Sequence, residues 1–250
     1  MLESPEPNLN QADSEEASKS TLTQAPSVPK WEQKSRDRIR SVLPKLVRPV
    51  EALLERDAVE ADTRMLVTDL LCDVLGYDKY EDLTAEYQVK GDFADIGIRV
   101  DKQLKAFVEI KRVKQDLNRS HLRQVESYAI REGVVWAILT NARQWHLYRV
   151  EPVVGQQSEL TLVLKIDLLD SNSTRERLDA FFLLSREAMM KNRLEEYWGG
   201  VQATSPKVLH QILLSDGVIS QVSKELWRQT RQKPSKDHLK KVISEMLGID

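Results

Sequence analysis

Three residues in the central part of the chain have the types and spacing of a metal-dependent hydrolytic site. Asp95 lies in one predicted strand, and Glu109-Ile110-Lys111 ends the next one, after the apolar run Ala106-Phe107-Val108. A hairpin across residues 101–105 would bring the Asp95 and Glu109 carboxylates to the same end of a sheet. Close carboxylates repel each other unless a cation neutralises them, and hard oxygen ligands suit Mg²⁺, with Mn²⁺ as a substitute.

Lys111 would serve the same site, because side chains two positions apart on a strand project to the same face. In phosphodiester hydrolysis the metal would lower the pKa of an attacking water, and the ammonium would orient that water or stabilise the transition state. A role as general base would require a depressed pKa. The spacing alone is weak evidence, since Glu32-Gln33-Lys34 repeats it outside any strand. Taken alone, the three residues are better explained as ion pairs at strand ends.

The surrounding elements alternate between strands and helices. A helix is predicted from about Ala58 to a stop at Gly76, and a polar helix over 116–132 favours a parallel crossover between the strands on either side of it. Asn141-Ala142-Arg143 is short enough for a hairpin turn. Short segments rich in β-branched or aromatic residues predict strands over 86–90, 94–100, 106–111, 134–140, 145–150 and 160–169.

Composition divides the chain into four parts. Residues 1–29 are rich in Ser, Pro, Glu, Gln and Asn, which predicts a disordered tail. Residues 30–57 form an amphipathic helical leader that Pro44 and Pro49 are expected to interrupt or kink. An α/β domain follows over 58–170, and 171–250 is a helical subdomain. In that subdomain, breaks are expected at Gly199-Gly200 and Ser205-Pro206, before helices over 206–215, 217–232 and 235–247.

Bulk properties exclude some classes of protein. The 250 residues are 41% hydrophobic with a formal net charge of -2, which fits a globular chain and does not by itself indicate nucleic-acid binding. Cys72 is the only cysteine, so internal disulfides are excluded and a reducing compartment, the cytoplasm, is expected. No apolar run is long enough to predict a membrane span. The four histidines have no metal-ligand spacing and are assigned no chemistry.

Two residues of the crossover helix extend the candidate site. Gln124 and Tyr128 lie one helical turn apart, so both can face the strand ends. Together with Asp95 and Glu109-Ile110-Lys111, they resemble the PD-(D/E)xK nuclease superfamily, in the branch with a Gln-x-x-x-Tyr motif. The resemblance implies that Gln124 and Tyr128 support the active site or contact DNA. A half-buried aromatic residue under the sheet is an equally good explanation of Tyr128 considered alone.

The flanking sequence narrows the resemblance. Glu60-Ala61-Asp62-Thr63-Arg64, Leu75-Gly76-Tyr77, Glu86-Tyr87, Leu139-Thr140-Asn141 and Trp145-His146-Leu147-Tyr148 are similar, in this order, to the N-terminal domain of type I restriction enzyme R subunits. The resemblance covers about 58–170. It implies a restriction-endonuclease-like α/β core with a mixed central sheet flanked by helices. It also implies that Glu60 assists the metal site, although an acid favourable to the helix dipole explains Glu60 somewhat better.

The resemblance also implies partners. DNA is the expected substrate, and Arg112, Lys114, Arg119 and Arg123 are candidates for phosphate contacts, with a solvated helix face as the competing explanation. The chain contains no Gly-x-x-x-x-Gly-Lys-Ser/Thr phosphate loop and is too short for a helicase motor. The candidate partners are therefore separate specificity, methyltransferase or motor subunits, and a second copy of the chain in a homo-oligomer. The residue before Asp95 is Ala94, whereas the PD-(D/E)xK motif has proline there. This difference says little about activity.

Two functions follow as hypotheses. The first is a Mg²⁺-dependent DNA endonuclease of restriction or defence type. In it, Asp95 and Glu109 hold the metal, Lys111 acts on the water, and Gln124 and Tyr128 support them. The second is a nucleic-acid or protein binding module that keeps the nuclease fold without turnover, since a fold does not ensure a function.

Overall fold

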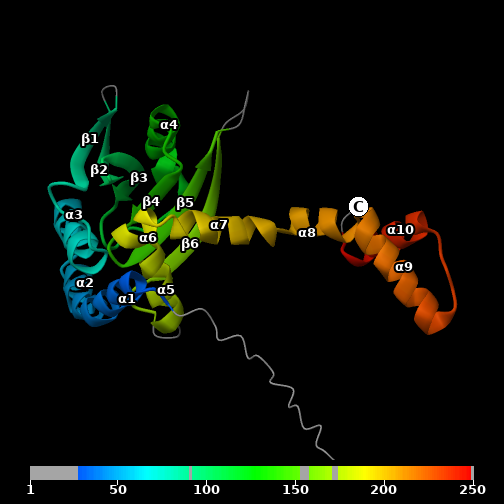
Figure 1. Ribbon diagram of the computed structural model, residues 1–250. Helices are drawn as coiled ribbons and strands as arrows, with labels where there is room; N and C mark the ends of the chain where they lie inside the picture. The colour runs from blue at the N-terminus through cyan, green and yellow to red at the C-terminus, as the bar shows by residue number, and fades with distance from the viewer. Residues whose placement is uncertain (1–27, 90–91, 153–157, 171–173, 249–250) are drawn as a thin grey trace, which may run out of the picture.

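The computed structural model describes residues 28–89, 92–152, 158–170 and 174–248. The predicted disordered tail, 1–29, lies almost wholly outside the described residues. The described chain forms a six-stranded mixed sheet with helices on both faces, followed by further helices (Figure 1). The predicted α/β class with a C-terminal helical part is therefore confirmed. None of the helices described is both long and apolar enough to cross a membrane.

The sheet follows chain order, β1-β2-β3-β4-β5-β6. Its middle pair, β3 and β4, runs parallel, and the other neighbouring pairs run antiparallel. Helix α4 (Arg123–Glu132) is the crossover that makes the parallel pair possible, as predicted. The strands are β1 (Leu83–Val89), β2 (Asp92–Val100), β3 (Gln103–Ile110), β4 (Trp136–Thr140), β5 (Gln144–Glu151) and β6 (Glu159–Asp167).

Short turns determine the register of the sheet. Asp101 and Lys102 both have positive φ, 51° and 66°, and form a two-residue turn between β2 and β3 that pairs Ile96 with Val108. This is the turn class whose twist matches that of antiparallel strands. Ala142, with a φ of 69°, turns β4 into β5 as expected. The ends of β2 and β3 that carry Asp95 and Glu109 therefore lie side by side.

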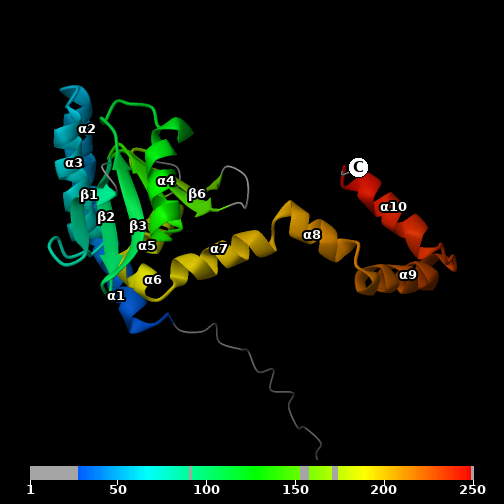
Figure 2. The ribbon, with the colours of Figure 1, turned by 90° about the horizontal axis from the view of Figure 1, so that it is seen from above.

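The two faces of the sheet are covered unequally. Helix α4, together with Leu122 just before it, covers one face, where Val125 and Tyr128 pack on Phe107 and Leu139. The larger core on the other face contains residues from the leader to Trp198, so the leader and the first C-terminal helices pack together with the α/β domain. As Figure 2 shows from above, that face is covered by α1 (Lys30–Val42), α2 (Val47–Glu55), α3 (Glu60–Asp69) and α5 (Thr174–Leu183).

The crossover helix begins later than predicted. The sequence predicts a helix over 116–132, whereas a 3-10 turn, η3 (Arg119–Leu122), precedes α4. Asn118 has extended backbone angles and caps this turn by accepting the Ser120 N–H at 3.0 Å. A side chain that accepts backbone N–H groups marks a helix start, which explains why the residues before Asn118 stay outside the helix.

The leader is helical but does not break at both prolines. Helix α1 leads through a 3-10 turn, η1 (Leu43–Leu46), into α2. Pro44 lies in η1, at the predicted interruption. Pro49 does not interrupt the helix, because it lies in the first turn of α2, where a backbone N–H has no partner within the helix.

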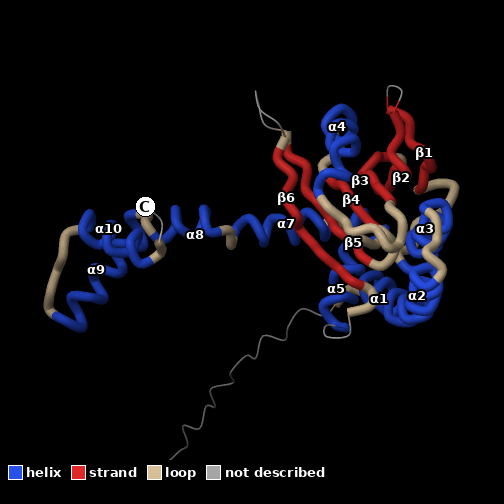
Figure 3. Tube along the Cα trace, turned by 180° about the vertical axis from the view of Figure 1, so that it is seen from behind, coloured by secondary structure: helices blue, strands red, loops and turns tan. Residues whose placement is uncertain are grey.

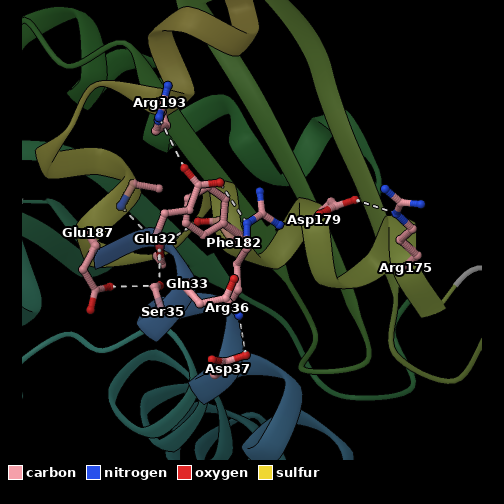
Figure 4. A network of polar contacts seen from close by, with 12 residues as sticks. Glu32, Gln33, Ser35, Arg36, Asp37, Arg175, Asp179, Phe182, Glu187 and Arg193 are labelled. Carbon is pink, nitrogen blue, oxygen red and sulfur yellow. Dashed lines mark hydrogen bonds and ion pairs between the residues drawn. The ribbon is translucent and has the colours of Figure 1, made fainter. Parts of the chain in front are cut away.

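Hydrogen bonds and ion pairs connect the leader to the C-terminal helices, as the network in Figure 4 shows. Glu32 accepts hydrogen bonds from Arg36 at 2.9 Å and from Arg193 at 3.3 Å. Glu187 accepts from Ser35 at 3.3 Å. These contacts join α1 to α6 (Arg186–Met190) and α7 (Arg193–Ala203) across more than a hundred residues of sequence.

Helix α3 continues into a π-helical turn, η2 (Leu70–Val74), and ends at Gly76, whose φ is +80°. The predicted helix stop at Gly76 is thus confirmed. Arg38 lies against Gly76 and donates to the Val74 and Leu75 carbonyls at 2.9 and 3.1 Å. Its guanidinium also binds both oxygens of Glu187, at 2.6 and 2.7 Å.

The break that the sequence predicts at Gly199-Gly200 is wrong. Gly199 and Gly200 lie inside α7, which continues to Ala203. Glu195 anchors this helix to the sheet by accepting from the Trp136 Nε1–H at 2.7 Å and from Arg149 at 2.9 Å. The helix is thus held by tertiary contacts that outweigh the low helix propensity of glycine. The break at Ser205-Pro206 is confirmed, because Ser205 caps the next helix.

The last three helices extend away from the core as an arm (Figures 1 and 3). They are α8 (Pro206–Leu213), α9 (Asp216–Thr230) and α10 (Lys236–Met246), close to the predicted ranges. Ser215 and Ser235 cap α9 and α10. Ile219 and Leu239 are buried, but no residue of the arm belongs to the main core among the residues described.

Candidate active site

Asp95 lies in the first half of β2, where the end of the neighbouring strand and a helix hold its side chain. Its Oδ2 accepts the Ile110 N–H at 2.7 Å, which ties it to the end of β3. Its Oδ1 accepts a hydrogen bond from Arg64 Nη2 on α3. The side chain is 12% exposed. Both carboxylate oxygens therefore have partners, one on the sheet and one on the helix.

Glu109 and Lys111 form the second half of the site. The Lys111 ammonium lies 2.5 Å from Glu109 Oε1, which confirms that both side chains project to the same face. The Lys111 N–H also binds the Thr140 carbonyl at 2.8 Å, so β4 fixes the backbone where β3 ends. The Glu109 side chain is 8% exposed and that of Lys111 18%. The pair is thus largely shielded from solvent.

The titration of this pair reflects its burial and its neighbours. Burial raises the pKa of Glu109; the charges of Asp95 and Glu60 add to this, and the hydrogen bond from Lys111 opposes it. Burial lowers the pKa of Lys111, but the hydrogen bond and charge of Glu109, with the charges of Glu60 and Asp95, outweigh it, so that the pKa is raised. Lys111 and Glu109 thus form an ion pair in this arrangement.

Glu60 is the first residue of α3, and its charge reaches Glu109, Lys111 and His121. Its place at the helix N-terminus suits the helix dipole, and its charge also adds to the negative potential of the site. Glu60 is therefore compatible with both interpretations made from the sequence.

Sequence reasoning missed two residues near the site. His121 was assigned no chemistry, yet burial and the Lys111 charge lower its pKa, and its ring lies 3.1 Å from the Gln115 side chain. Arg64 pairs directly with Asp95. A signal for Arg64 was present, because it follows Glu60 by four positions and so shares its helix face.

Gln124 and Tyr128 occupy different environments on α4. Gln124 is exposed. Tyr128 is 1% exposed and packs edge-on against Phe107, with ring centroids 6.4 Å apart. Its ring is thus part of the core between α4 and the sheet. Asp95, Glu109 and Lys111, in contrast, lie close together on β2 and at the end of β3. Glu60 is at the start of α3.

The candidate phosphate-binding residues lie on the surface beyond the site. Arg112 pairs with Asp57 at 3.0 Å, and Lys114 lies 4.0 Å from the same carboxylate. Both pairs are about half exposed, so these contacts are weak enough to exchange for other anions. Arg119 and Arg123 are exposed at η3 and the start of α4.

The donor chemistry of the site fits a hard divalent cation. Asp95 and Glu109 supply carboxylate oxygens. Burial, and to a lesser extent the charge of Asp95, raise the pKa of Glu109, and a cation between the two carboxylates would relieve the charge repulsion. Within the described ranges, no three Asp, Glu, His or Cys side chains are grouped closely enough to hold a metal by themselves. Two carboxylates are compatible with Mg²⁺, which binds proteins through one or two carboxylates and takes its other ligands from water and phosphate.

Comparisons with known proteins bear on this domain. Neither the search of curated proteins nor that of solved structures gives a match. Residues 59–163 match the model of one protein family, and they include Glu60, the strand ends with Asp95, Glu109 and Lys111, and α4. The resemblance inferred from the sequence is thereby confirmed for this segment, which matches the model described as the N terminus of the type I restriction enzyme R protein.

Proposed function

We propose that the chain is a metal-dependent DNA endonuclease of restriction or defence type. The observation that carries the proposal is the meeting of Asp95, Glu109 and Lys111 at the ends of β2 and β3, inside the segment that matches the restriction family. Cleavage would take place in the cytoplasm. Specificity, methyltransferase or motor functions would come from separate subunits, and a homo-oligomer is compatible with this proposal.

In this proposal Asp95 and Glu109 hold Mg²⁺, or Mn²⁺ in its place. The metal supplies Lewis acidity, which lowers the pKa of a water and offsets charge on the phosphate. The Lys111 ammonium, which lies beside Glu109, orients the attacking water and stabilises the developing charge. Arg112, Lys114, Arg119 and Arg123 contact DNA phosphates, and Gln124 and Tyr128 support the site from α4.

The test is cleavage of plasmid DNA in Mg²⁺ by the full chain, alone and together with proteins encoded by neighbouring genes. We expect Lys111→Ala to lower the cleavage rate about 100-fold or more, the usual loss when a group that stabilises transition-state charge is removed. Lys114→Ala is the matched control and should change binding more than turnover. Cleavage that is unaffected by Lys111→Ala, or absent under every condition, would contradict the proposal.

A second function is favoured by the ion pairs of the site. Arg64 and Lys111 already neutralise Asp95 and Glu109 without any metal. A binding module on the nuclease fold would use the same stable arrangement to hold nucleic acid or protein. Calorimetric titration with Mn²⁺ separates the two functions, because only the nuclease requires cation binding that is lost in Asp95→Asn.

A further inference from the structure

Arg64 occupies the position of a counter-charge to the proposed metal ligand Asp95. It lies on α3, one turn after Glu60, and its Nη2 donates to Asp95 Oδ1. The other oxygen, Oδ2, is taken by the Ile110 N–H at 2.7 Å. Oδ1 is thus the oxygen that has no backbone donor. A cation that bound there would lie close to the Arg64 guanidinium, whose charge would repel it.

The Arg64 guanidinium also has an alternative partner. Its Nη1 lies 3.8 Å from Glu86 Oε1, on β1. The ladder pairs Ala85 with Ile96 and Tyr87 with Ala94, and leaves Glu86 and Asp95 between these two pairs. Glu86 has a φ of +47°, an unfavourable backbone conformation for a residue other than glycine. This local irregularity presents a second carboxylate to Arg64 directly across from the first.

Space for movement is present beside the guanidinium. A hollow of about 310 Å³ between α3 and the first two strands is lined by Arg64, Thr68, Ala85 and Ile96. The Arg64 Nε is buried and makes no hydrogen bond to any residue that the structure describes. The guanidinium is thus held mainly by carboxylates at its tip, so that exchanging one carboxylate for the other does not break further contacts.

We infer that Arg64 is a positioning residue that competes with the metal for Asp95. Without metal it neutralises Asp95 and keeps the carboxylates from repelling each other. When a divalent cation binds, Arg64 moves from Asp95 toward Glu86. The affinity of the site for the cation is then set by this exchange, and it is weaker than two free carboxylates would give. This inference rests on the proposed function, since it assumes that the same site holds a metal.

The test is Mn²⁺ binding to the full chain, measured by calorimetry and by electron paramagnetic resonance of free Mn²⁺. We expect Arg64→Met to lower the dissociation constant about tenfold, within the usual range of coupling between two sites. Asp95→Asn added to this variant should abolish the gain. Glu86→Gln, which removes the alternative partner, should shift the constant the opposite way, by about twofold for an exposed pair.

Arg56→Met is the matched control, because Arg56 pairs with Asp62 of α3 at 3.1 Å, and neither residue belongs to the site. It should leave Mn²⁺ binding unchanged. A second measurement is the rise in melting temperature on adding Mn²⁺, which should be larger for Arg64→Met than for wild type. Arg64→Gln, which keeps a donor for Asp95, provides the same comparison if the Met variant does not fold.

The outcomes separate the two proposals. If the wild type binds Mn²⁺ through Asp95 but Arg64→Met binds it equally or more weakly, Arg64 does not compete with the metal, and the nuclease proposal stands. If neither protein binds Mn²⁺ in a manner that depends on Asp95, the metal-dependent function itself fails.

Discussion

At the scale of single residues, the site shows how two acids can lie side by side with little exposure to solvent. Asp95 has Arg64 as its partner, and Glu109 has Lys111. A buried carboxylate without such a cation would take up a proton, because desolvation disfavours its charged form. The charge balance of the site is therefore a property of four side chains from α3, β2 and the end of β3.

His146 on β5 is a buried histidine outside the candidate active site, and it makes the stability of the fold depend on pH. It is 5% exposed, and both ring nitrogens are buried without a hydrogen-bond partner among the residues described. Burial and the nearby Lys165 lower its pKa from the ordinary value of 6.5. The folded protein therefore binds fewer protons here than the unfolded chain, and stability is lost as the pH falls below 6.5.

We expect His146→Phe to flatten this dependence. The difference from wild type in the pH slope of the unfolding free energy should approach about 1 kcal/mol per pH unit just below the ordinary histidine pKa. Urea unfolding at several pH values measures it. His238→Phe on the exposed face of α10 is the control. Equal slopes for His146→Phe and wild type would show that His146 is not kept neutral by the fold.

At the scale of elements, two glycines that end helices differ in their surroundings. Gly76 and Gly133 both have positive φ, +80° and +67°. A Cβ on Gly76 would lie 2.5 Å from Arg38 Nη2, whereas a Cβ on Gly133 would meet nothing within 4 Å. The end of α3 is thus packed against the leader, and the end of α4 is open.

We predict that Gly76→Ala destabilises the protein more than Gly133→Ala does. Gly133→Ala should cost about 1–2 kcal/mol, the strain of alanine in the left-handed region. Gly76→Ala adds the displacement of Arg38 from Glu187 and from the carbonyls that end η2, which should bring the cost to about 3 kcal/mol or more. Chemical denaturation of both variants measures the difference. Equal costs would mean that the Arg38 contacts contribute nothing.

For a glycine inside α7 we expect the opposite effect, a gain of stability on replacement by alanine. Gly199 is exposed and lies within the helix, and a methyl group added to it would meet nothing within 4 Å. Gly199→Ala should therefore stabilise the protein by about 0.5–1 kcal/mol through the higher helix propensity of alanine. Thermal unfolding is the measurement, and a decrease in melting temperature would contradict α7 as a continuous helix in solution.

At the scale of the whole molecule, the arm of α8 to α10 is separate from the main core. Residues 205–248 hold eight Lys or Arg and four Asp or Glu, so the arm is basic in a chain whose formal net charge is -2. Arg231 lies over the Trp227 ring, 4.8 Å from its centroid. The arm also exposes apolar side chains: Leu209, Ile212, Leu213, Trp227, Val242, Met246 and Leu247.

A chain that ends after Thr204 should therefore keep its core. We expect its unfolding free energy to change by less than about 1 kcal/mol, because no buried residue of the main core is removed. A chain that ends after Leu183 is the contrasting variant. It loses the buried Ala188, Met189, Leu194 and Trp198, and should unfold far more easily. Calorimetric unfolding compares the two, and collapse of the first variant would show that the arm supports the core.

Local sequence patterns were enough to predict most of the elements and the geometry at the ends of β2 and β3. Strand alternation placed Glu109 and Lys111 on one face, and a hairpin after Val100 brought Asp95 beside them. These relations involve residues close together in the chain, and backbone geometry enforces them. The helix stop at Gly76 and the parallel crossover followed from equally local signals.

Contacts between distant segments could be known only from the folded chain. The pairing of Arg64 with Asp95 joins α3 to β2, and the clamp between Arg38 and Glu187 joins α1 to α6. The continuity of α7 through Gly199-Gly200 depends on how Glu195 meets the sheet. No local pattern encodes such contacts, because packing and charge pairing between remote residues outweigh local propensity.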